Sequence, residues 1–223
     1  MPPRTYVIGD IHGCAVTMRR LVDEMLRPLP ADRIYLLGDL IDRGPDSKGV
    51  LDFIFELRER GLSVDSIRGN HEEMYLQAGE DHYYLGLWNA NGGPATLASF
   101  QGDGPGDIPQ RYRDFLASLP LFILLDDFVI VHAGLNFYTP FPFDDTDTML
   151  WTRSHFVDPQ LIGGRRLICG HTPVTRTRLE ASLNSSKIML DNGCVSGNRP
   201  EMGNLAALEL ESMTLFLQPN VDL

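Results

Sequence analysis

Apolar runs of strand length recur along this 223-residue chain, and each leads to a polar side chain of a kind that binds metal ions. The runs are TYVIGD, RIYLLGD, SIRGN, FVIVHAG and RLICGH, and the side chains are Asp10 with His12, Asp39, Asn70, His132 and His171. Parallel strands bring such residues to one crevice beyond their carboxyl ends. A single Gly-Asp pair after a strand is usually an ordinary turn. Five such strand ends in one chain favour a shared site.

Glycine precedes four of these positions, at Gly9, Gly38, Gly69 and Gly170. We expect these glycines to adopt the tight, unusual backbone that turns a side chain inward at a crowded rim. The six side chains offer oxygen and nitrogen but no thiolate, which suits Mn, Fe, Zn or Mg. They are too many for one tetrahedral zinc and suit two divalent ions that share a carboxylate. The positive surplus of such a centre would attract a phosphate dianion.

The elements that must position these residues follow from the periodicity. One helical face is predicted from Met18, Leu21, Val22, Met25 and Leu26, and a second helix over 46–60 should stop at Gly61. These segments separate the first three runs and predict a β-α-β-α-β opening with parallel strands. Residues 72–119 are predicted to be mainly helical, with breaks at NANGGP and QGDGPGD. After Pro120 the strands LFILL, FVIVH, RRLIC, KIML, LAALELE and TLFLQ follow, with a turn at 211–213. We expect one α/β domain, 1–223, with two stacked sheets.

Composition limits the class of protein. The hydrophobic content is 43%, ordinary for a globular chain, and the formal charge of -11 argues against a nucleic-acid partner. No apolar run reaches the length of a membrane span, and the N-terminus lacks a secretory pattern, so we expect no membrane partner. The three cysteines form no C-x-x-C motif and cannot all pair, which favours a reduced, cytoplasmic setting. Oligomeric state cannot be read from these features.

The motifs GDIHG (9–13), GDLIDRG (38–44), GNHE (69–72), HAG (132–134) and GHT (170–172) together resemble a known signature. It is that of the phosphoprotein phosphatases, in particular the bacterial and phage lambda-type Ser/Thr phosphatases, within the calcineurin-like metallophosphoesterase superfamily. DNGCV (191–195) adds a similar segment. The resemblance implies an α/β/β/α sandwich of two mixed sheets flanked by helices. It also implies two divalent metal ions, Mn first, with Fe, Zn or Mg as other options.

The resemblance assigns roles residue by residue. Asp10 and His12 would hold the first metal, Asp39 would bridge both, and Asn70, His132 and His171 would complete the second. His71 matches the catalytic histidine and Asp42 its partner, while Arg43 and Arg153 match phosphate-binding arginines. Asn70 would also face the substrate. The implied reaction is attack by a metal-bridging hydroxide on a phosphomonoester, with protonated His71 supplying a proton to the leaving oxygen.

Several functions remain open at this stage. A Ser/Thr protein phosphatase, with phosphotyrosine as a further option, is the leading interpretation, and its substrate would be a phosphorylated protein or a small phosphoester. A symmetrical dinucleoside tetraphosphate hydrolase is the alternative, although those relatives typically lack the Asp of DRG, here Asp42. A diesterase is a weaker alternative. A non-catalytic, metal-bound binding module would require a lost ligand or a lost acid, and none is missing.

Some residues have simpler interpretations. Asn70 could cap a helix instead of binding a metal, and Glu72 and Glu73 would be an acidic pair at a helix start. The segment from Cys14 to Arg20 satisfies C-x5-R, yet it looks like a helix face rather than a phosphate loop. We expect Cys14, Cys169 and Cys194 to be packing thiols, and His82 and His155 to lie outside the site.

Overall fold

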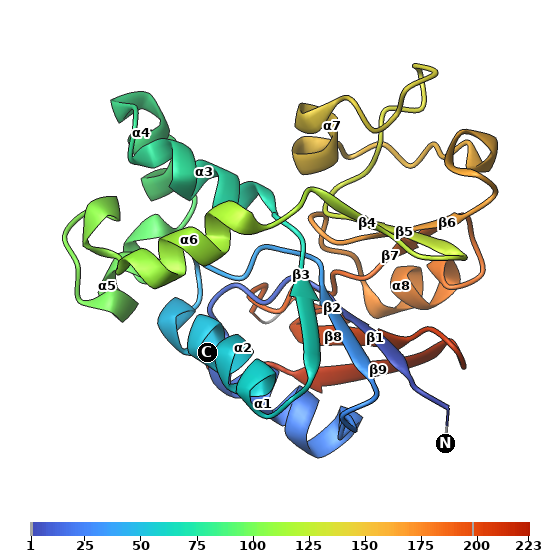
Figure 1. The fold of residues 1–223 in the computed structure, drawn as a ribbon, viewed down its shortest axis with the longest axis horizontal. Helices are drawn as coiled ribbons and strands as arrows, with labels where there is room; N and C mark the ends of the chain where they lie inside the picture. Colours follow the sequence, from blue (N-terminus) through green and yellow to red (C-terminus); the bar gives the residue numbers. More distant parts are fainter. Residues whose placement is uncertain (1, 198) are drawn as a thin grey trace.

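The strands of the computed structural model, which describes residues 2–197 and 199–223, form two sheets (Figure 1). The first contains, in spatial order, β3 (Ser63–Ser66), β2 (Arg33–Leu36), β1 (Thr5–Ile8), β8 (Asn204–Glu209) and β9 (Thr214–Pro219). The second contains β4 (Phe122–Leu124), β5 (Phe128–Val131), β6 (Arg166–Cys169) and β7 (Lys187–Met189). Both sheets combine parallel and antiparallel neighbours, as predicted.

The α-helices are α1 (Ala15–Arg20), α2 (Ser47–Glu59), α3 (Asn70–Ala78), α4 (His82–Ala90), α5 (Gly93–Phe100), α6 (Gln110–Ser118), α7 (Thr146–Trp151) and α8 (Arg176–Ser182). The other helical segments of the described ranges are the π-helix η1 (Leu21–Leu26) and the 3-10 helices η2 (Pro105–Asp107) and η3 (Pro159–Ile162). In Figure 1, α3 to α6 form a group on the left, and α7 lies on the side of the four-stranded sheet. Across the two described ranges, no helix is long and apolar enough to cross a membrane.

The side chains of each strand alternate between two cores. On β1, Tyr6 and Ile8 pack with α1 and α2, whereas Val7 enters a core that it shares with Ile130 of β5. The neighbouring residue Val131 faces the opposite way and packs with α7. Because Val7 and Ile130 come from different sheets, this middle core joins the sheets face to face. The layers therefore run helix, sheet, sheet, helix, and the predicted α/β/β/α sandwich is confirmed.

The predicted β-α-β-α-β opening is also confirmed. β1 pairs with β2 and β2 with β3, both in parallel. Ile8 lies opposite Leu36, and Leu36 lies opposite Ser66, so the three strands end at the same level. β5, β6 and β7 are parallel to one another in the second sheet. Each sheet thus brings together the carboxyl ends of three strands, and the loops beyond these ends carry the candidate ligands.

One part of the predicted first helical face is wrong. Leu21, Val22 and Leu26 are buried as expected, but Met25 is 37% exposed. The α-helix α1 stops at Arg20, and the chain continues as the π-helix η1. A π-helix has more residues per turn than an α-helix, so residue i+5 replaces residue i+4 on the same face. Leu26 therefore lies below Leu21, and Met25 turns outward.

The glycines before the candidate ligands are required for two different reasons. Gly38 has a positive φ of 82°, which confirms the expected unusual backbone at that position. Gly9, Gly69 and Gly170 do not have positive φ, so the predicted reason is wrong for them. A Cβ atom at Gly69 would overlap the Asp39 carboxylate, and one at Gly170 would overlap Asp10. These glycines allow neighbouring loops to approach closely.

Replacing Gly38 by Ala should lower stability far more than replacing Gly61 by Ala. Both glycines have a left-handed backbone, with φ of 82° and 83°. A Cβ at Gly38 would overlap the Gly69 backbone, whereas one at Gly61 would meet open space. We expect a loss of about 1 kcal/mol for Gly61→Ala from the backbone conformation alone, and about 3 kcal/mol or more for Gly38→Ala. Chemical denaturation measures both, and equal losses would show that close loop packing at Gly38 is unimportant.

Candidate metal centre

Potential metal ligands gather in two groups, and Asp39 belongs to both. His12 and His71 complete the first group, and His132 and His171 complete the second. Within each group the ligand atoms lie within 4.8 Å of one another. The two carboxylate oxygens of Asp39 face different groups. Oδ2 is 3.6 Å from His12 Nε2, and Oδ1 is 3.4 Å from His132 Nε2.

The structure places Asn70 with the second group, as predicted. Its Oδ1 is 2.9 Å from His132 Nε2 and 2.8 Å from His171 Nδ1. It is also the first residue of α3, while the N-cap position is Gly69. The interpretation of Asn70 as a simple helix cap is therefore wrong.

Asp10 contacts the backbone of the second group. Its Oδ2 accepts a 2.8 Å hydrogen bond from the backbone N–H of His171, and its assignment to the first metal together with His12 stays a prediction. The third member of the first group is His71, at 4.0 Å from Asp39 Oδ2. Within the described ranges, Oδ1 of Asp10 is buried and has no hydrogen-bond partner. A buried carboxylate oxygen without a donor is costly unless a cation neutralises it.

Two of the imidazoles are oriented by backbone carbonyls. His12 Nδ1 is 3.1 Å from the carbonyl oxygen of Ile41, and His132 Nδ1 is 2.7 Å from that of Leu37. A carbonyl can only accept, so each Nδ1 carries the hydrogen. In the neutral ring, Nε2 then offers a lone pair toward Asp39. This arrangement is typical of histidines that bind metal ions.

The pKa values of three histidines show which of them can bind a metal and where a positive charge is needed. Burial lowers the pKa of His12 to about 3 and that of His171 to about 3, so both are neutral at pH 7, the form that binds metals. Burial alone would also lower the pKa of His132, but Asp39 and Asp10 raise it to about 10. His132 Nε2 faces two acceptors, Asn70 Oδ1 and Asp39 Oδ1. Only a proton or a cation on Nε2 makes these contacts favourable.

These observations fit two divalent cations. The donor atoms are buried carboxylate, amide and imidazole groups, which suit Mn, Fe, Zn or Mg. Asp39 is available to both groups, and the unpartnered Asp10 oxygen lies beside the second. Arg43 Nη1 is 2.7 Å from His12 Nε2 and so uses the lone pair that a cation would take. A cation there would release the Arg43 guanidinium for an anionic substrate.

His71 and Asp42 form a buried pair. His71 Nδ1 is 2.7 Å from Asp42 Oδ2, and both side chains are fully buried. Within the described ranges, His71 Nε2 has no hydrogen-bond partner. Arg153, the second predicted phosphate-binding residue, is exposed and near enough to lower the pKa of His171 after the larger effect of burial.

Glu72 is an acidic residue at a helix start, as predicted, but it also has a role that its position in the sequence did not indicate. It is fully buried, and its carboxylate accepts 2.8 Å hydrogen bonds from the backbone N–H groups of Asp39, Leu40 and Gly69. These bonds fix the loop that presents Asp39 to both groups. The neighbouring Glu73 instead forms a 2.9 Å ion pair with Arg68. Spacing alone gave no signal for this difference, because Glu at the third helical position is a common capping residue.

Asp191 is a second residue that sequence reasoning left without a role. It belongs to DNGCV, is buried, and accepts a 2.7 Å hydrogen bond from Gly193 N–H. Burial raises its pKa to about 6, and Asp39 contributes in the same direction. Asp191 in turn raises the pKa of Asp10, after the larger effect of burial. The centre therefore contains more negative charge than its predicted ligands supply.

Backbone strain is concentrated at the site. Five of its non-glycine residues have positive φ, and they are His12, Asp39, Asp42, Arg43 and His171. Such conformations persist only where surrounding contacts enforce them, and they cluster at functional sites. One enforcing contact is a pair of hydrogen bonds from the N–H groups of Ile11 and His12 to the carbonyl of Asp39, at 3.1 and 2.8 Å.

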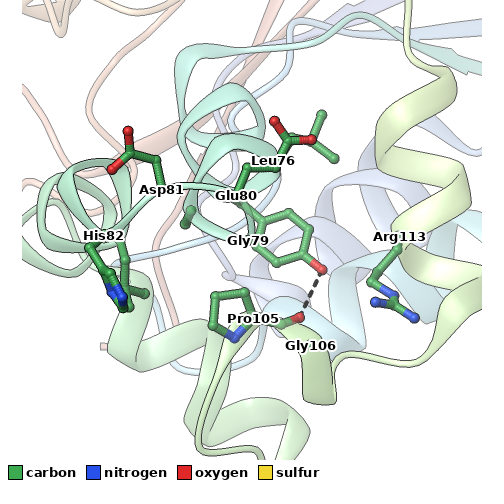
Figure 2. A pocket seen from close by; sticks show the side chains of 11 residues that line it. Leu76, Gly79, Glu80, Asp81, His82, Pro105, Gly106 and Arg113 are labelled. Atoms are coloured by element: carbon green, nitrogen blue, oxygen red, sulfur yellow. Dashed lines mark hydrogen bonds between the residues drawn. The ribbon is translucent and has the colours of Figure 1, made fainter.

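The residues expected outside the site do lie outside it. All three cysteines are buried, and burial raises the pKa of Cys169 to about 11. Ala15 to Arg20 form α1, so C-x5-R is not a phosphate loop. His82 and His155 are exposed. His82 lines a separate cavity of about 490 Å³ at the C-terminal end of α3, shown in Figure 2, to which none of the predicted ligands contributes.

The chain belongs to the calcineurin-like phosphoesterase family, whose sequence profile matches residues 3–208. This family uses a centre of two divalent metal ions, and the groups around Asp39 supply candidate ligands for it, so the chain is a metal-dependent phosphoesterase. Among its relatives is serine/threonine-protein phosphatase 1 of Salmonella typhimurium. The two are 31% identical over 208 residues, which cover 87% of this chain and 88% of that protein. This similarity agrees with the phosphoprotein phosphatase signature.

Other relatives are named symmetrical bis(5'-nucleosyl)-tetraphosphatases. That of Vibrio campbellii is 31% identical over 144 residues, 65% of this chain, and the chain spans only 47% of that protein's length. Among the solved structures that share the fold, two show its range. A protein described provisionally as a diadenosine tetraphosphatase has a TM-score of 0.70 at 22% identity, covering 99% of this chain and 95% of that one. A yeast (Saccharomyces cerevisiae) protein serine/threonine phosphatase has a TM-score of 0.64 at 15% identity, and the match covers 100% of this chain and 81% of that one.

Asp39→Asn should reduce the metal content of both groups. An amide removes the negative charge and one of the two ligating oxygens that face the two groups. We expect affinity for Mn to fall roughly tenfold or more at each site, since even changes beside a metal ligand have effects of this size. Elemental analysis after dialysis against limiting Mn measures the content. Asp42→Asn is the matched control and should retain both ions. Full metal content in Asp39→Asn would contradict a shared ligand.

Proposed function

We propose that this chain is a serine/threonine protein phosphatase that hydrolyses phosphomonoesters, with phosphotyrosine as a further substrate. The observation that carries the proposal is the buried His71–Asp42 pair, with 2.7 Å between Nδ1 and Oδ2. A seryl or threonyl alkoxide is a poor leaving group and needs a proton as it departs. An imidazole held by a carboxylate and with a free Nε2 is suited to supply that proton.

Arg43, Arg153 and Asn70 bind and orient the phosphate of the substrate. Arg43 and Arg153 offer forked N–H donors to phosphoryl oxygens and to the negative charge that develops on them. Asn70 presents its amide beside the second group and can contact the substrate as well. When bound, the two divalent ions supply an activated water molecule and neutralise charge on the phosphoryl oxygens.

His71 and Asp42 act as a unit. Burial lowers the pKa of His71 to about 4 and raises that of Asp42 to about 8. At neutral pH the pair therefore retains the proton that lies between Nδ1 and Oδ2, and it titrates as one system. A second hydrogen on Nε2 then points away from Asp42. Its donation to the leaving oxygen is assisted by the carboxylate behind the ring.

A symmetrical dinucleoside tetraphosphatase is the second candidate. The relatives with that name and the structure with a TM-score of 0.70 favour it. Asp42 argues against it, because those enzymes typically lack this residue and a nucleotide leaving group has less need of a proton. The relative named serine/threonine-protein phosphatase 1 also matches over most of both chains, unlike the tetraphosphatases.

A side-by-side assay tests the proposed function. We expect the protein to hydrolyse a phosphoserine peptide faster than diadenosine tetraphosphate, with Mn, Mg, Fe or Zn supplied separately. Activity should disappear with a chelator and return with metal, because the ligands are arranged for divalent ions. Faster hydrolysis of diadenosine tetraphosphate under every metal would favour the second candidate. Absence of turnover on both substrates, with metals bound, would indicate a binding module.

His71→Asn should lose activity in proportion to the substrate's need for a proton. General acid catalysis contributes roughly 10² to 10⁴ in rate. We therefore expect kcat on a phosphoserine peptide to fall by about 10² or more, and kcat on an aryl phosphate with a good leaving group to fall by less than about tenfold. Metal content, measured in parallel, should be unchanged. Similar losses on both substrates, or loss of a metal ion, would instead assign His71 as a ligand of the first group.

A further inference from the structure

The hairpin formed by α4 and α5 packs over the His71–Asp42 pair and supplies two buried donors to it. Thr96 Oγ1 donates to Asp42 Oδ1 at 2.6 Å. Trp88 Nε1 donates to the same carboxylate and lies 3.0 Å from Oδ1 and 2.9 Å from Oδ2. All three side chains are fully buried. We propose that Trp88 and Thr96 are positioning residues, which hold the Asp42 carboxylate in the orientation that aligns His71 as the general acid.

The hydrogen-bond pattern fixes the Asp42 carboxylate from every side. The Thr96 hydroxyl donates to Oδ1, His71 Nδ1 lies at Oδ2, and the Trp88 indole lies between them within reach of both oxygens. The Asp42 backbone N–H lies 2.9 Å from Thr96 Oγ1 and 3.0 Å from Ser47 Oγ. Since the Thr96 hydrogen is directed to Asp42, the 2.9 Å contact between the two hydroxyls must be a bond donated by Ser47. A network with each hydrogen assigned permits one carboxylate orientation.

The same donors suit a carboxylate, which only accepts hydrogen bonds. The Thr96 hydroxyl donates to Oδ1, and the Trp88 indole lies within reach of both oxygens. A neutral acid would need an acceptor for a hydrogen of its own, and in this geometry only His71 Nδ1, at 2.7 Å from Oδ2, is placed for that role.

Packing holds Trp88 in this position. The Tyr75 ring lies 5.3 Å from that of Trp88, and a Cβ at Gly93 would overlap the indole. Tyr75 also donates to the carbonyl of Pro105 at 3.3 Å, the dashed contact in Figure 2, so the cavity at the end of α3 is walled by the residue that supports Trp88. A phenylalanine would keep an aromatic ring beside Tyr75, although it would leave part of the indole volume empty. The direction of the indole N–H toward Asp42 is the feature that packing alone does not require.

The turn between the two helices holds the residue after Asp42. The carbonyl of Gly92 accepts a 3.3 Å hydrogen bond from the backbone N–H of Arg43. Gly92 has a φ of 112°, and a Cβ there would overlap Arg43. Trp88, Gly92 and Thr96 thus recur every four residues and hold the Asp42–Arg43 segment along its length. Both the proton donor and the phosphate-binding arginine depend on this hairpin.

Three variants test the inference, which rests on the proposed function. Thr96→Val removes the hydroxyl with little change of shape, Thr96→Ser retains it, and Trp88→Phe removes the indole N–H. We expect Thr96→Val and Trp88→Phe to lower kcat on a phosphoserine peptide by roughly ten- to a hundredfold, part of the general acid effect. On an aryl phosphate, kcat should fall by less than about threefold, and KM for both substrates should be nearly unchanged. Thr96→Ser should restore most of the peptide activity.

The outcomes separate this inference from the proposed function. No turnover of the phosphoserine peptide by the unaltered protein would overturn the proposed function, and with it the inference. Turnover with equal losses on both substrates in Thr96→Val, or with no loss on either, would overturn the inference alone. If Trp88→Phe fails to fold, as judged by circular dichroism, the Thr96→Val and Thr96→Ser pair still decides.

Discussion

A single buried carboxylate, that of Asp39, organises the site. Its two oxygens face different groups of imidazoles, so one charge serves both halves of the centre. Burial alone would raise the pKa of Asp39, yet His132 and His71 hold it well below its usual value. The Asp39 backbone is held just as firmly, through the N–H bond to Glu72 and the carbonyl bonds from Ile11 and His12. Displacing Asp39 would therefore disturb both groups of ligands.

The site also depends on the packing of the two sheets. Asp39 and Asn70 follow strands of the five-stranded sheet, whereas His132 and His171 follow strands of the four-stranded sheet. The core between the sheets, where Val7 meets Ile130, brings the two sets together, and the contact of His132 with the Leu37 carbonyl joins them directly. Without cations, the buried Asp10, Asp39 and Asp191 repel one another and lack full compensation. Metal binding to the folded chain is thus coupled to its stability.

The strand ends and most of the fold could be predicted because their signals are local. Apolar runs followed by Gly-Asp, Gly-Asn or Gly-His indicated parallel strands with ligands at their ends, and the structure brings those ligands together. Contacts between distant segments could not be predicted in this way. Glu72 resembles a helix-start residue and Trp88 an ordinary core residue, and their hydrogen bonds to Asp39 and Asp42 appear only in the folded chain. Met25 was misplaced because a π-helix has no distinct sequence period.

An anomalous difference map would show directly whether two cations share Asp39. Crystals grown with Mn would be measured on both sides of its absorption edge. We expect two peaks, one beside each carboxylate oxygen of Asp39, with His12 near one and His132 near the other. A single peak, or two peaks neither of which contacts Asp39, would contradict this arrangement.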